Sequence, residues 1–203
     1  MAILRLLFFA LSVLVLSVTR VFAADGPTAG LVVGANFGAV GLGGSGAAGF
    51  DPGFKAGVVA GGFGLFPLTP KVAIQPEVAY SQKRFTLKDS ARSFNATDRW
   101  DWIEVPVLLR VGVTSHSSGP YVIGGPGFSY LSRAKEQEGG RTFDIKDGVK
   151  RVDVSVIGGI GYAAGHFGVE ARFDAGVRNL NKGLGSNITV ESRAVRMNVT
   201  WRP

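Results

Sequence analysis

The sequence predicts an all-β fold, a closed up-and-down antiparallel β-barrel of about eight strands. Three observations indicate this fold. Glycine accounts for 30 of the 203 residues and is spread along the chain, which disfavours long helices. Apolar and polar residues alternate with a period of two in several segments. The connections between these segments are alternately long and short.

Residues 1–23 have the pattern of a secretory signal peptide. Arg5 supplies a positive charge, residues 6–16 are apolar apart from Ser12, and residues 21–23 read Val-Phe-Ala, a pattern typical of a cleavage site. The apolar run is shorter than the roughly 20 residues of a spanning helix, which is the alternative. We therefore expect cleavage before Ala24 and a single barrel domain over residues 24–203.

Composition narrows the classes of function. The chain has no cysteine, which excludes disulfides and thiol chemistry. It carries 22 Lys plus Arg against 15 Asp plus Glu; removing Arg5 and Arg20 leaves 20 basic residues and a net charge of +5. An exported chain without a run of more than two Lys or Arg does not suit nucleic acid. No later apolar stretch is long enough for a spanning helix, so a membrane crossing must use strands.

Eight segments are strand-like, in order residues 31–38, 54–66, 72–85, 99–111, 120–132, 152–163, 166–177 and 195–201. The first has Leu31, Val33 and Phe37 on one face, opposite Asn36 and glycines. The second, third and sixth alternate less regularly. In residues 120–132 the pattern does not decide which side chains share a face.

The fourth, seventh and eighth segments alternate most clearly. Each has an apolar face and a face that carries charged residues. The apolar faces are Ile103, Val105, Val107 and Leu109; Val169, Ala171, Phe173, Ala175 and Val177; and Val195, Met197, Val199 and Trp201. The opposite faces include Glu104 and Arg110; Glu170, Arg172 and Asp174; and Arg196, Asn198 and Thr200.

The lengths of the connections predict a membrane barrel. The connections are residues 40–53, 67–71, 86–98, 112–119, 133–151, 164–165 and 178–189, with lengths of 14, 5, 13, 8, 19, 2 and 12 residues. Outer-membrane barrels have long extracellular loops and short periplasmic turns. A soluble barrel has no reason to keep this rhythm.

Alternation alone leaves a soluble lipocalin-like barrel as an alternative, with the apolar face inside. Two features favour the membrane barrel. The polar faces are rich in the small residues that fit a narrow interior. Aromatic residues near strand ends indicate the girdles found at membrane interfaces, namely Phe66, Tyr80, Phe85, Trp100, Trp102, Tyr121 and Trp201.

Three prolines lie inside expected strands, Pro76, Pro106 and Pro126. Proline has no N–H to donate to the ladder, and a closed barrel has no free edge to accommodate it. We therefore expect each proline to mark a β-bulge or a local twist.

Several stretches resemble the small outer-membrane β-barrel family that is often called the porin family or outer-membrane protein β-barrel domain. They are residues 75–83 (QPEVAYSQK), 103–110 (IEVPVLLR), Tyr121 with 124–126 (GGP), 169–173 (VEARF) and 176–180 (GVRNL). The resemblance covers essentially all of residues 24–203. It implies the barrel fold, a location in the outer membrane of a Gram-negative bacterium, proline at these strand positions, and assembly by the barrel-assembly machinery. It brings no catalytic residues.

A set of charged residues falls on the faces assigned to the interior. They are Glu77, Glu104, Arg110, Asp153, Glu170, Arg172, Asp174 and Arg196. Buried charges are costly unless they are paired, so we expect a network of ion pairs. An interior of eight strands is just wide enough for side chains, which favours a plugged lumen over the alternative, a polar conduit or gate.

Basic residues are frequent on the long connections and at the strand ends that join them. Candidates for binding lipopolysaccharide phosphates by charge-assisted hydrogen bonds are Lys83, Arg84, Arg99, Arg133, Lys150, Arg151, Arg178 and Arg193. The alternative is ordinary solvated loop charge, balanced by nearby acids.

Catalytic and metal chemistry are not indicated. His116 and His166 fall on the periplasmic turns, and Ser115 and Ser117 beside His116 do not make a nucleophile–base pair, so we expect solvated turn residues. Residues 41–46 fit GxGxxG but are not followed by a helix pattern. Asp144 and Asp147 are too few for a calcium site. We expect no catalytic residue, no metal and no cofactor.

The sequence thus predicts a monomeric outer-membrane barrel with a structural or interaction role, presenting extracellular loops, and not an enzyme. Its expected partners are outer-membrane lipid and lipopolysaccharide, and the barrel-assembly machinery during biogenesis. A narrow diffusion channel for ions or small solutes is the alternative. A soluble exported barrel that binds an apolar ligand is the second alternative.

Overall fold

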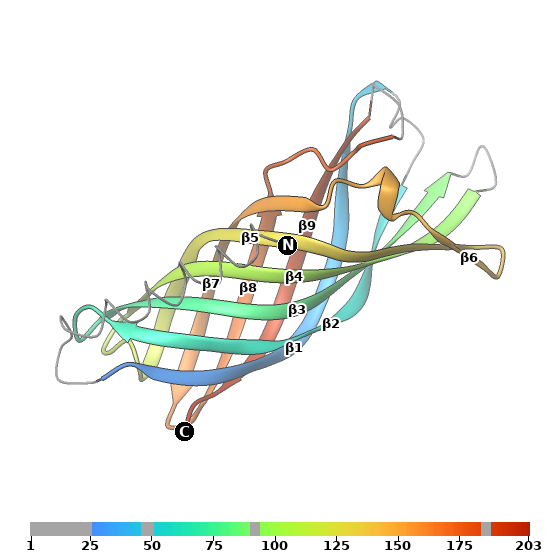
Figure 1. Ribbon diagram of the computed structural model, residues 1–203. Helices are drawn as coiled ribbons and strands as arrows, with labels where there is room; N and C mark the ends of the chain where they lie inside the picture. Colours follow the sequence, from blue (N-terminus) through green and yellow to red (C-terminus); the bar gives the residue numbers. More distant parts are fainter. Residues whose placement is uncertain (1–25, 46–50, 90–93, 184–187) are drawn as a thin grey trace, which may run out of the picture.

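The computed structural model describes residues 26–45, 51–89, 94–183 and 188–203, and in these residues the chain is a β-barrel (Figure 1). The expected signal peptide, residues 1–23, lies outside them. No helix of the described part of the chain is long and apolar enough to cross a membrane.

The elements follow one another as β-strands, and a short helical turn lies between two of them. The strands are β1 Thr28–Gly43, β2 Asp51–Pro67, β3 Val72–Asp89, β4 Phe94–Gly112, β5 Gly119–Glu138, β6 Arg141–Asp144, β7 Val152–Ala164, β8 Phe167–Gly176 and β9 Thr189–Trp201. The 3-10 turn η2, Lys146–Gly148, lies between β6 and β7.

The barrel closes through neighbours along the chain. Every pairing is antiparallel, and β1 pairs with β9 to complete the ring. The short strand β6 pairs with the far end of β5 and stands outside the ring. The hairpin turn between β5 and β6 is Gly139-Gly140, whose positive φ angles of 55° and 81° suit glycine. The described strands therefore form the closed, eight-stranded up-and-down barrel that the sequence predicts.

Short and long connections gather at opposite ends, as predicted. Residues 68–71, 113–118 and 165–166 form the short turns, at the end where β1 begins and β9 ends. The C-terminus and β6 lie at opposite ends of the molecule (Figure 1). In the outer-membrane arrangement, the turn end is periplasmic and the β6 end is extracellular.

Several predicted loops are in fact paired strand. β3 and β4 pair as far as Asp89 and Phe94, within the expected connection 86–98. β5 continues to Glu138, inside the expected connection 133–151. The prediction was wrong here because alternation marks a strand only where one face is apolar. Outside the membrane both faces of a strand can be polar while its hydrogen-bond ladder continues.

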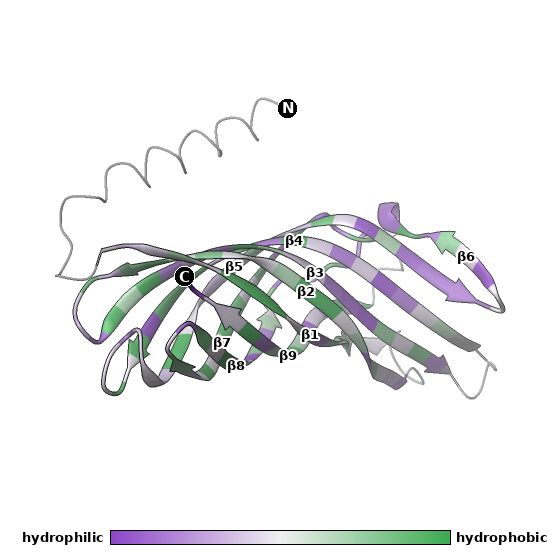
Figure 2. Ribbon diagram, turned by 90° about the horizontal axis from the view of Figure 1, so that it is seen from below, coloured by the Kyte–Doolittle hydropathy of each residue, from purple (hydrophilic) through white to green (hydrophobic). Residues whose placement is uncertain are grey.

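The apolar face points outward. On β4, Ile103, Val107 and Leu109 are exposed while Glu104 and Arg110 are buried. The outward apolar positions of β4 run over residues 103–111, which matches the roughly 9–11 residues of a tilted membrane strand. Residues 94–102 of β4 extend beyond this apolar band, where hydrophilic residues become frequent (Figure 2). This arrangement is the inverse of a soluble barrel and rules out the lipocalin-like alternative.

The structure decides the faces of β5, which the pattern left open. Tyr121, Ile123 and Leu131 point inward, whereas Phe128 and Tyr130 are exposed outside. Both faces carry apolar residues, so alternation of polarity could not separate them.

None of the three prolines produces a β-bulge, so the expectation of a bulge was wrong. Each interrupts one ladder for two residue pairs, after which pairing resumes in the same register. Near Pro76, pairing of β2 with β3 passes from Phe63–Glu77 to Phe66–Ile74. The gaps at Pro106 and Pro126 lie in the β3–β4 and β4–β5 ladders. A missing N–H removes local hydrogen bonds, but the pairs on either side hold the register. The two register shifts lie elsewhere, at Lys55/Val59 and Asp101/Trp102.

The aromatic girdle was assigned in part to the wrong residues. Phe85, Trp100, Trp102 and Tyr121 are buried inside the barrel. Their strands place them on the inward face, and nearness to a strand end does not reveal that face. Exposed aromatic side chains do flank the apolar band, with Tyr130 toward the extracellular end and Tyr162, Phe167 and Trp201 toward the periplasmic end.

Candidate functional site: the lumen and the outer rim

The lumen is filled in layers along the barrel axis. Two small apolar clusters occupy the periplasmic part, one made of Val32, Phe63, Leu65 and Ala73, the other of Leu108, Tyr121, Ile123, Ile157 and Ala163. Charged residues occupy the middle, and a larger apolar cluster fills the extracellular part.

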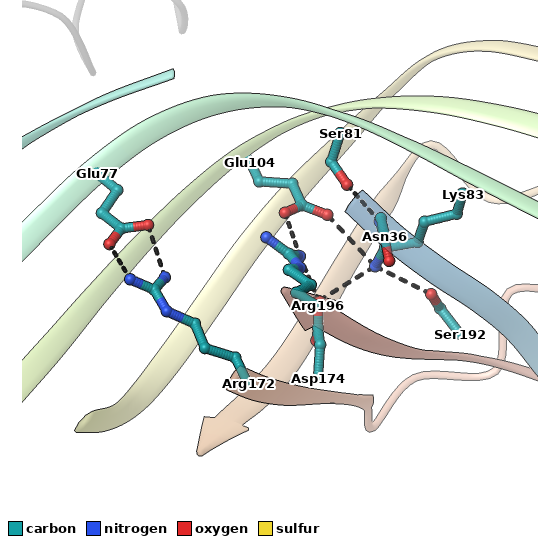
Figure 3. Close-up of polar contacts among 9 residues, drawn as sticks. All are labelled: Asn36, Glu77, Ser81, Lys83, Glu104, Arg172, Asp174, Ser192 and Arg196. Atoms are coloured by element: carbon teal, nitrogen blue, oxygen red, sulfur yellow. Dashed lines mark hydrogen bonds and ion pairs between the residues drawn. The ribbon is translucent and has the colours of Figure 1, made fainter. Parts of the chain in front are cut away.

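Arg172 on β8 is the centre of the first charged group. It reaches across the lumen to Glu77 on β3, with Nη1 and Nη2 donating to the two carboxylate oxygens at 2.9 and 2.7 Å (Figure 3). Its Nη2 also lies 2.5 Å from Glu170 Oε2. The Tyr121 hydroxyl donates to the other oxygen of Glu170 at 2.7 Å, and Gln75 donates to Glu77 at 2.8 Å. Such two-pronged, charge-assisted contacts fix the orientation of the guanidinium.

The second charged group joins β3, β4, β8 and β9. Arg196 donates to Glu104 and, at 2.6 Å, to Asp174. Lys83 Nζ lies 3.3 Å from Glu104 and 3.2 Å from Asp174, and also donates to Ser192 at 3.1 Å (Figure 3). Each of the two cations therefore contacts both carboxylates, which is the pairing that buried charges require.

All eight residues predicted for the lumen are buried inside, with exposed fractions of at most 4%. Six of them belong to the two ion-paired groups. Asp153 lies in the same interior and accepts the backbone N–H of Val154 at 2.8 Å. Arg110 stacks on Tyr121, 3.5 Å from the ring centroid. The sequence identified six members of the ion-paired groups but missed Lys83, and it did not show which residues pair with which.

Lys83 corrects one prediction. It was expected among the surface contacts to lipopolysaccharide, but only 2% of it is exposed and it belongs to the lumen network. On β3 the residues Glu77, Ala79, Ser81, Lys83 and Phe85 all point inward. Counting in steps of two from Glu77 would have placed Lys83 inside.

The extracellular part of the lumen holds an aromatic cluster that the sequence analysis missed. Phe85 and Trp100 meet edge to face with centroids 5.0 Å apart, and Trp102 lies 6.2 Å from Trp100. Leu131 and Leu180 are also fully buried in it. Residues of the connections cover this cluster, because Leu180 N–H donates to Val190 O at 2.7 Å and Lys150 N–H to Leu180 O at 2.8 Å. We call it the aromatic plug; its members are Val40, Phe85, Trp100, Trp102, Leu131, Ala134, Val149, Leu180 and Val190.

Two acids line the inner wall beside the aromatic plug. Asp98 on β4 pairs across the ladder with Glu136 on β5. Burial, together with the charge of Glu136, raises the pKa of Asp98 to about 7. Burial and the charge of Glu138 raise the pKa of Glu136 as well. Both residues lie beyond the apolar band.

The other seven predicted lipopolysaccharide contacts lie near the outer edge of the apolar band. Arg133, Arg151, Arg178 and Arg193 are exposed, whereas Arg84, Arg99 and Lys150 are half-buried. Acids or carbonyls hold several of them, since Arg99 donates to Asp101 at 2.9 Å, Arg193 to Glu191 at 3.4 Å and Arg151 to Asp147 at 3.4 Å. The hydrogen bond to Asp101 raises the pKa of Arg99.

Three of these arginines lie on adjacent strands. Arg84 pairs with Arg99 across β3 and β4, and Asp101 pairs with Arg133 across β4 and β5. The ladder therefore brings Arg84, Arg99 and Arg133 onto one part of the wall, above Ile103. We call this set, together with Arg151, Arg178 and Arg193, the arginine rim. It can donate hydrogen bonds to phosphate oxygens at the membrane surface.

The histidines are held by backbone carbonyls. His116 Nδ1 lies 3.0 Å from Pro70 O, and His166 Nδ1 lies 2.9 Å from Arg202 O. His116 is buried, which corrects the expectation that it is solvated, because the turn folds back on Pro70. Within the described ranges, no group of three or more His, Cys, Asp or Glu could hold a metal ion.

A closed ring with apolar residues outside, ion pairs inside and short turns at one end defines a transmembrane β-barrel of the outer-membrane type. Residues 23–182 match the family described as outer membrane protein beta-barrel domain. The chain belongs to this family, and it is a protein of the outer membrane.

The first of three similar solved structures supports the fold. Neisserial surface protein A is similar with a TM-score of 0.56 and 15% identity over 88% of this chain and 100% of that one. The attachment invasion locus protein Ail of Yersinia pestis has a TM-score of 0.46 and 12% identity, covering 87% and 99%. OprG of Pseudomonas aeruginosa has a TM-score of 0.44 and 14% identity, over 87% of this chain and 97% of that one. Among curated protein sequences, none matches this chain.

Proposed function

We propose that this protein is a closed, non-catalytic barrel that reinforces the outer membrane and presents a rigid extracellular extension. The aromatic plug is the observation that supports this proposal most directly. Trp102 and Leu131 are completely buried within it, and Trp100 nearly so. Below it the carboxylates and cations of the lumen neutralise one another, so neither layer offers a hydrated path for ions.

Conductance in planar lipid bilayers tests the closed lumen. We expect the wild-type protein to show no steady open state. Substitution Trp102→Gly removes a large side chain from the plug, and Arg172→Met breaks the ion-paired layer; we expect conductance only when both layers are opened. Tyr130→Gly, an exposed aromatic position on the outside, is the matched control. A steady, ion-selective current through the wild-type protein would instead establish the narrow channel.

The arginine rim supports a role for lipopolysaccharide as partner. Arg133, Arg178 and Arg193 are exposed beyond the apolar band, where the phosphates of the outer leaflet lie. Guanidinium groups match phosphate with paired hydrogen bonds. We propose that the rim binds these phosphates and thereby anchors the barrel in the leaflet.

Binding of lipopolysaccharide to the detergent-folded protein tests this partner. We expect the triple variant Arg133→Gln, Arg178→Gln and Arg193→Gln to bind several-fold more weakly, and dephosphorylated lipopolysaccharide to bind the wild type no better than the variant. Lys71→Gln, an exposed change at the periplasmic end, is the control. Equal binding by the variant and the wild type would contradict the proposal.

We further propose that the protein is a monomer and is inserted by the barrel-assembly machinery. In the described residues every long strand pairs on both sides, which leaves no long free edge for a second copy. Chemical cross-linking in native membranes and depletion of the machinery test these two points.

A further inference from the structure

Arg110 differs from the other cations of the lumen. In the described part of the chain, Lys83, Arg172 and Arg196 each contact carboxylates. Arg110 is equally buried, with 1% of it exposed, but it makes no ion pair with any described residue. Its Nη1 donates to Gln75 Oε1 at a long 3.5 Å, and its plane lies on the ring of Tyr121.

The other edge of the Arg110 guanidinium has no acceptor from the protein. Both Nε and Nη2 lie inside the lumen without a hydrogen-bond partner. These two nitrogens form the side of the guanidinium that donates two parallel N–H bonds. An entire donor edge is therefore directed at a position that no protein oxygen occupies.

The nearest acids are already engaged. The oxygens of Glu170 contact the Tyr121 hydroxyl and Arg172, and those of Glu77 contact Arg172 and Gln75. Rotating either acid toward Arg110 would remove one of the two carboxylates that Arg172 contacts. A carboxylate of the protein therefore cannot satisfy Arg110 without breaking the network.

Charges of both signs act on the guanidinium of Arg110, namely those of Glu170, Arg202 and Arg172. Arg202, next to the last residue of the chain, is anchored at the turn end by donating to Ser117 O at 2.7 Å. Tyr121 is kept flat beneath Arg110 because its partner strand carries Gly161, where a Cβ would lie 2.3 Å from the ring. Tyr121 covers one face of the guanidinium, which leaves the edge formed by Nε and Nη2 for a ligand.

We propose that Arg110 forms a binding site for a small monovalent anion of halide size at the periplasmic end of the lumen. Nε and Nη2 donate to the ion, and Arg202 adds a second positive charge at the opening. The ion supplies the negative charge that a buried guanidinium needs and satisfies its remaining N–H groups. The site is independent of the arginine rim, which lies at the other end of the barrel.

Bromide is the probe, because its anomalous scattering identifies it directly. Crystals of the detergent-folded protein are soaked in sodium bromide, and data are collected at the bromine edge. We expect a peak within hydrogen-bonding distance of Nε and Nη2 of Arg110, and its loss in Arg110→Met. Arg133→Met, a change on the outer rim, should keep the peak. If wild-type crystals showed bromide peaks at surface sites only, with water at Arg110, the proposal would be overturned. This result does not depend on whether the variant folds.

Thermal unfolding in detergent gives a second readout. An ion that binds the folded state alone stabilises it in a concentration-dependent way. The unfolding midpoint of the wild type should rise with bromide and saturate, relative to sulfate at the same ionic strength, and Arg110→Met should lose this difference. An equal response of both proteins would mean a general salt effect and would exclude a specific site.

Discussion

Individual residues of the lumen show how paired charges are tolerated in a narrow interior. Arg172 contacts Glu77 and Glu170, and Lys83 and Arg196 share Glu104 and Asp174. A buried ion pair contributes little compared with an apolar filling, but removal of one partner leaves an uncompensated charge. The consequence of each substitution therefore depends on what it leaves behind.

Replacement Arg172→Met should destabilise the barrel strongly. It strands the carboxylates of Glu77 and Glu170 in the interior, and breaking a buried pair in this way costs about 3–5 kcal/mol. Urea unfolding from lipid vesicles measures the free energy of unfolding. Arg133→Met on the exposed rim should change it by less than about 0.5 kcal/mol. A stability of Arg172→Met equal to the wild type would mean that the lumen is hydrated.

Asp98 should make the extracellular extension sensitive to pH. Its folded pKa of about 7 lies above the ordinary value of 3.8. The folded state therefore holds the proton more tightly than the unfolded chain does. The protonated carboxyl of Asp98 contributes fully to the free energy of unfolding below about pH 4. This contribution is lost as the pH rises to about 7, by on the order of 1.4 kcal/mol for each pH unit. Asp98→Asn should remove this decline and be more stable than the wild type at pH 8.

Tryptophan fluorescence during unfolding at pH 5 and pH 8 checks this expectation, because Trp100 lies beside Asp98 on β4. Asp147→Asn, in a highly exposed position, is the control and should keep the wild-type pH dependence. A wild type that gains stability between pH 5 and pH 8 would contradict the role assigned to Asp98.

Single elements reach beyond the membrane without losing their ladders. β3, β4 and β5 continue past the apolar band, and β6 folds back on β5 through Gly139-Gly140. Inside this extension the side chains of Phe85, Trp100 and Trp102 pack together. The described part of the extension is therefore built around a core of its own rather than as a long open loop.

Trypsin added to intact cells should therefore cut at a restricted place in residues 133–151. Arg141 directly follows the hairpin turn and is exposed, whereas Arg133 lies in a strand paired with β4. We expect the first cleavage of this segment after Arg141, because it lies at the hairpin tip in a short strand that pairs on one side only, whereas Arg133 lies in a long strand within the barrel wall. Mass spectrometry of the released fragments identifies the site, and Arg141→Gln should abolish that cut. First cleavage after Lys71, an exposed residue of the short turn before β3, would mean that the orientation is inverted.

At the scale of the whole molecule, closure of the ladder is the main source of cohesion. Eight strands each pair on both sides, so backbone N–H and C=O groups are satisfied within the ring, as a membrane requires. A closed ring cannot fray strand by strand from an edge.

Detergent-folded protein should accordingly show a β-rich circular dichroism spectrum and migrate faster on gels before boiling than after it. The closed ladder resists denaturation until heated, so the unboiled protein stays compact. Comparison of boiled and unboiled samples measures this difference in migration. A spectrum dominated by helix, or identical migration, would be incompatible with the barrel.

The sequence alone was enough to predict the class of fold, the end at which the short turns lie and the eight charges in the lumen. These features depend on a period of two, because successive side chains alternate between the lipid face and the narrow interior. The sequences of β4, β8 and β9 show this period most clearly. The inward position of Lys83 could also have been predicted from this period, but Lys83 was assigned to the strand ends that join the long connections.

Only the tertiary structure decided which residues meet. Glu77 and Arg172 are 95 positions apart, and their contact depends on the stagger of all the strands between them. The aromatic plug and the paired strands beyond the membrane could likewise not be predicted from the sequence, because polarity no longer alternates there while hydrogen bonding continues. Local pattern fixes the face of a strand, whereas closure of the ring fixes what lies across the lumen.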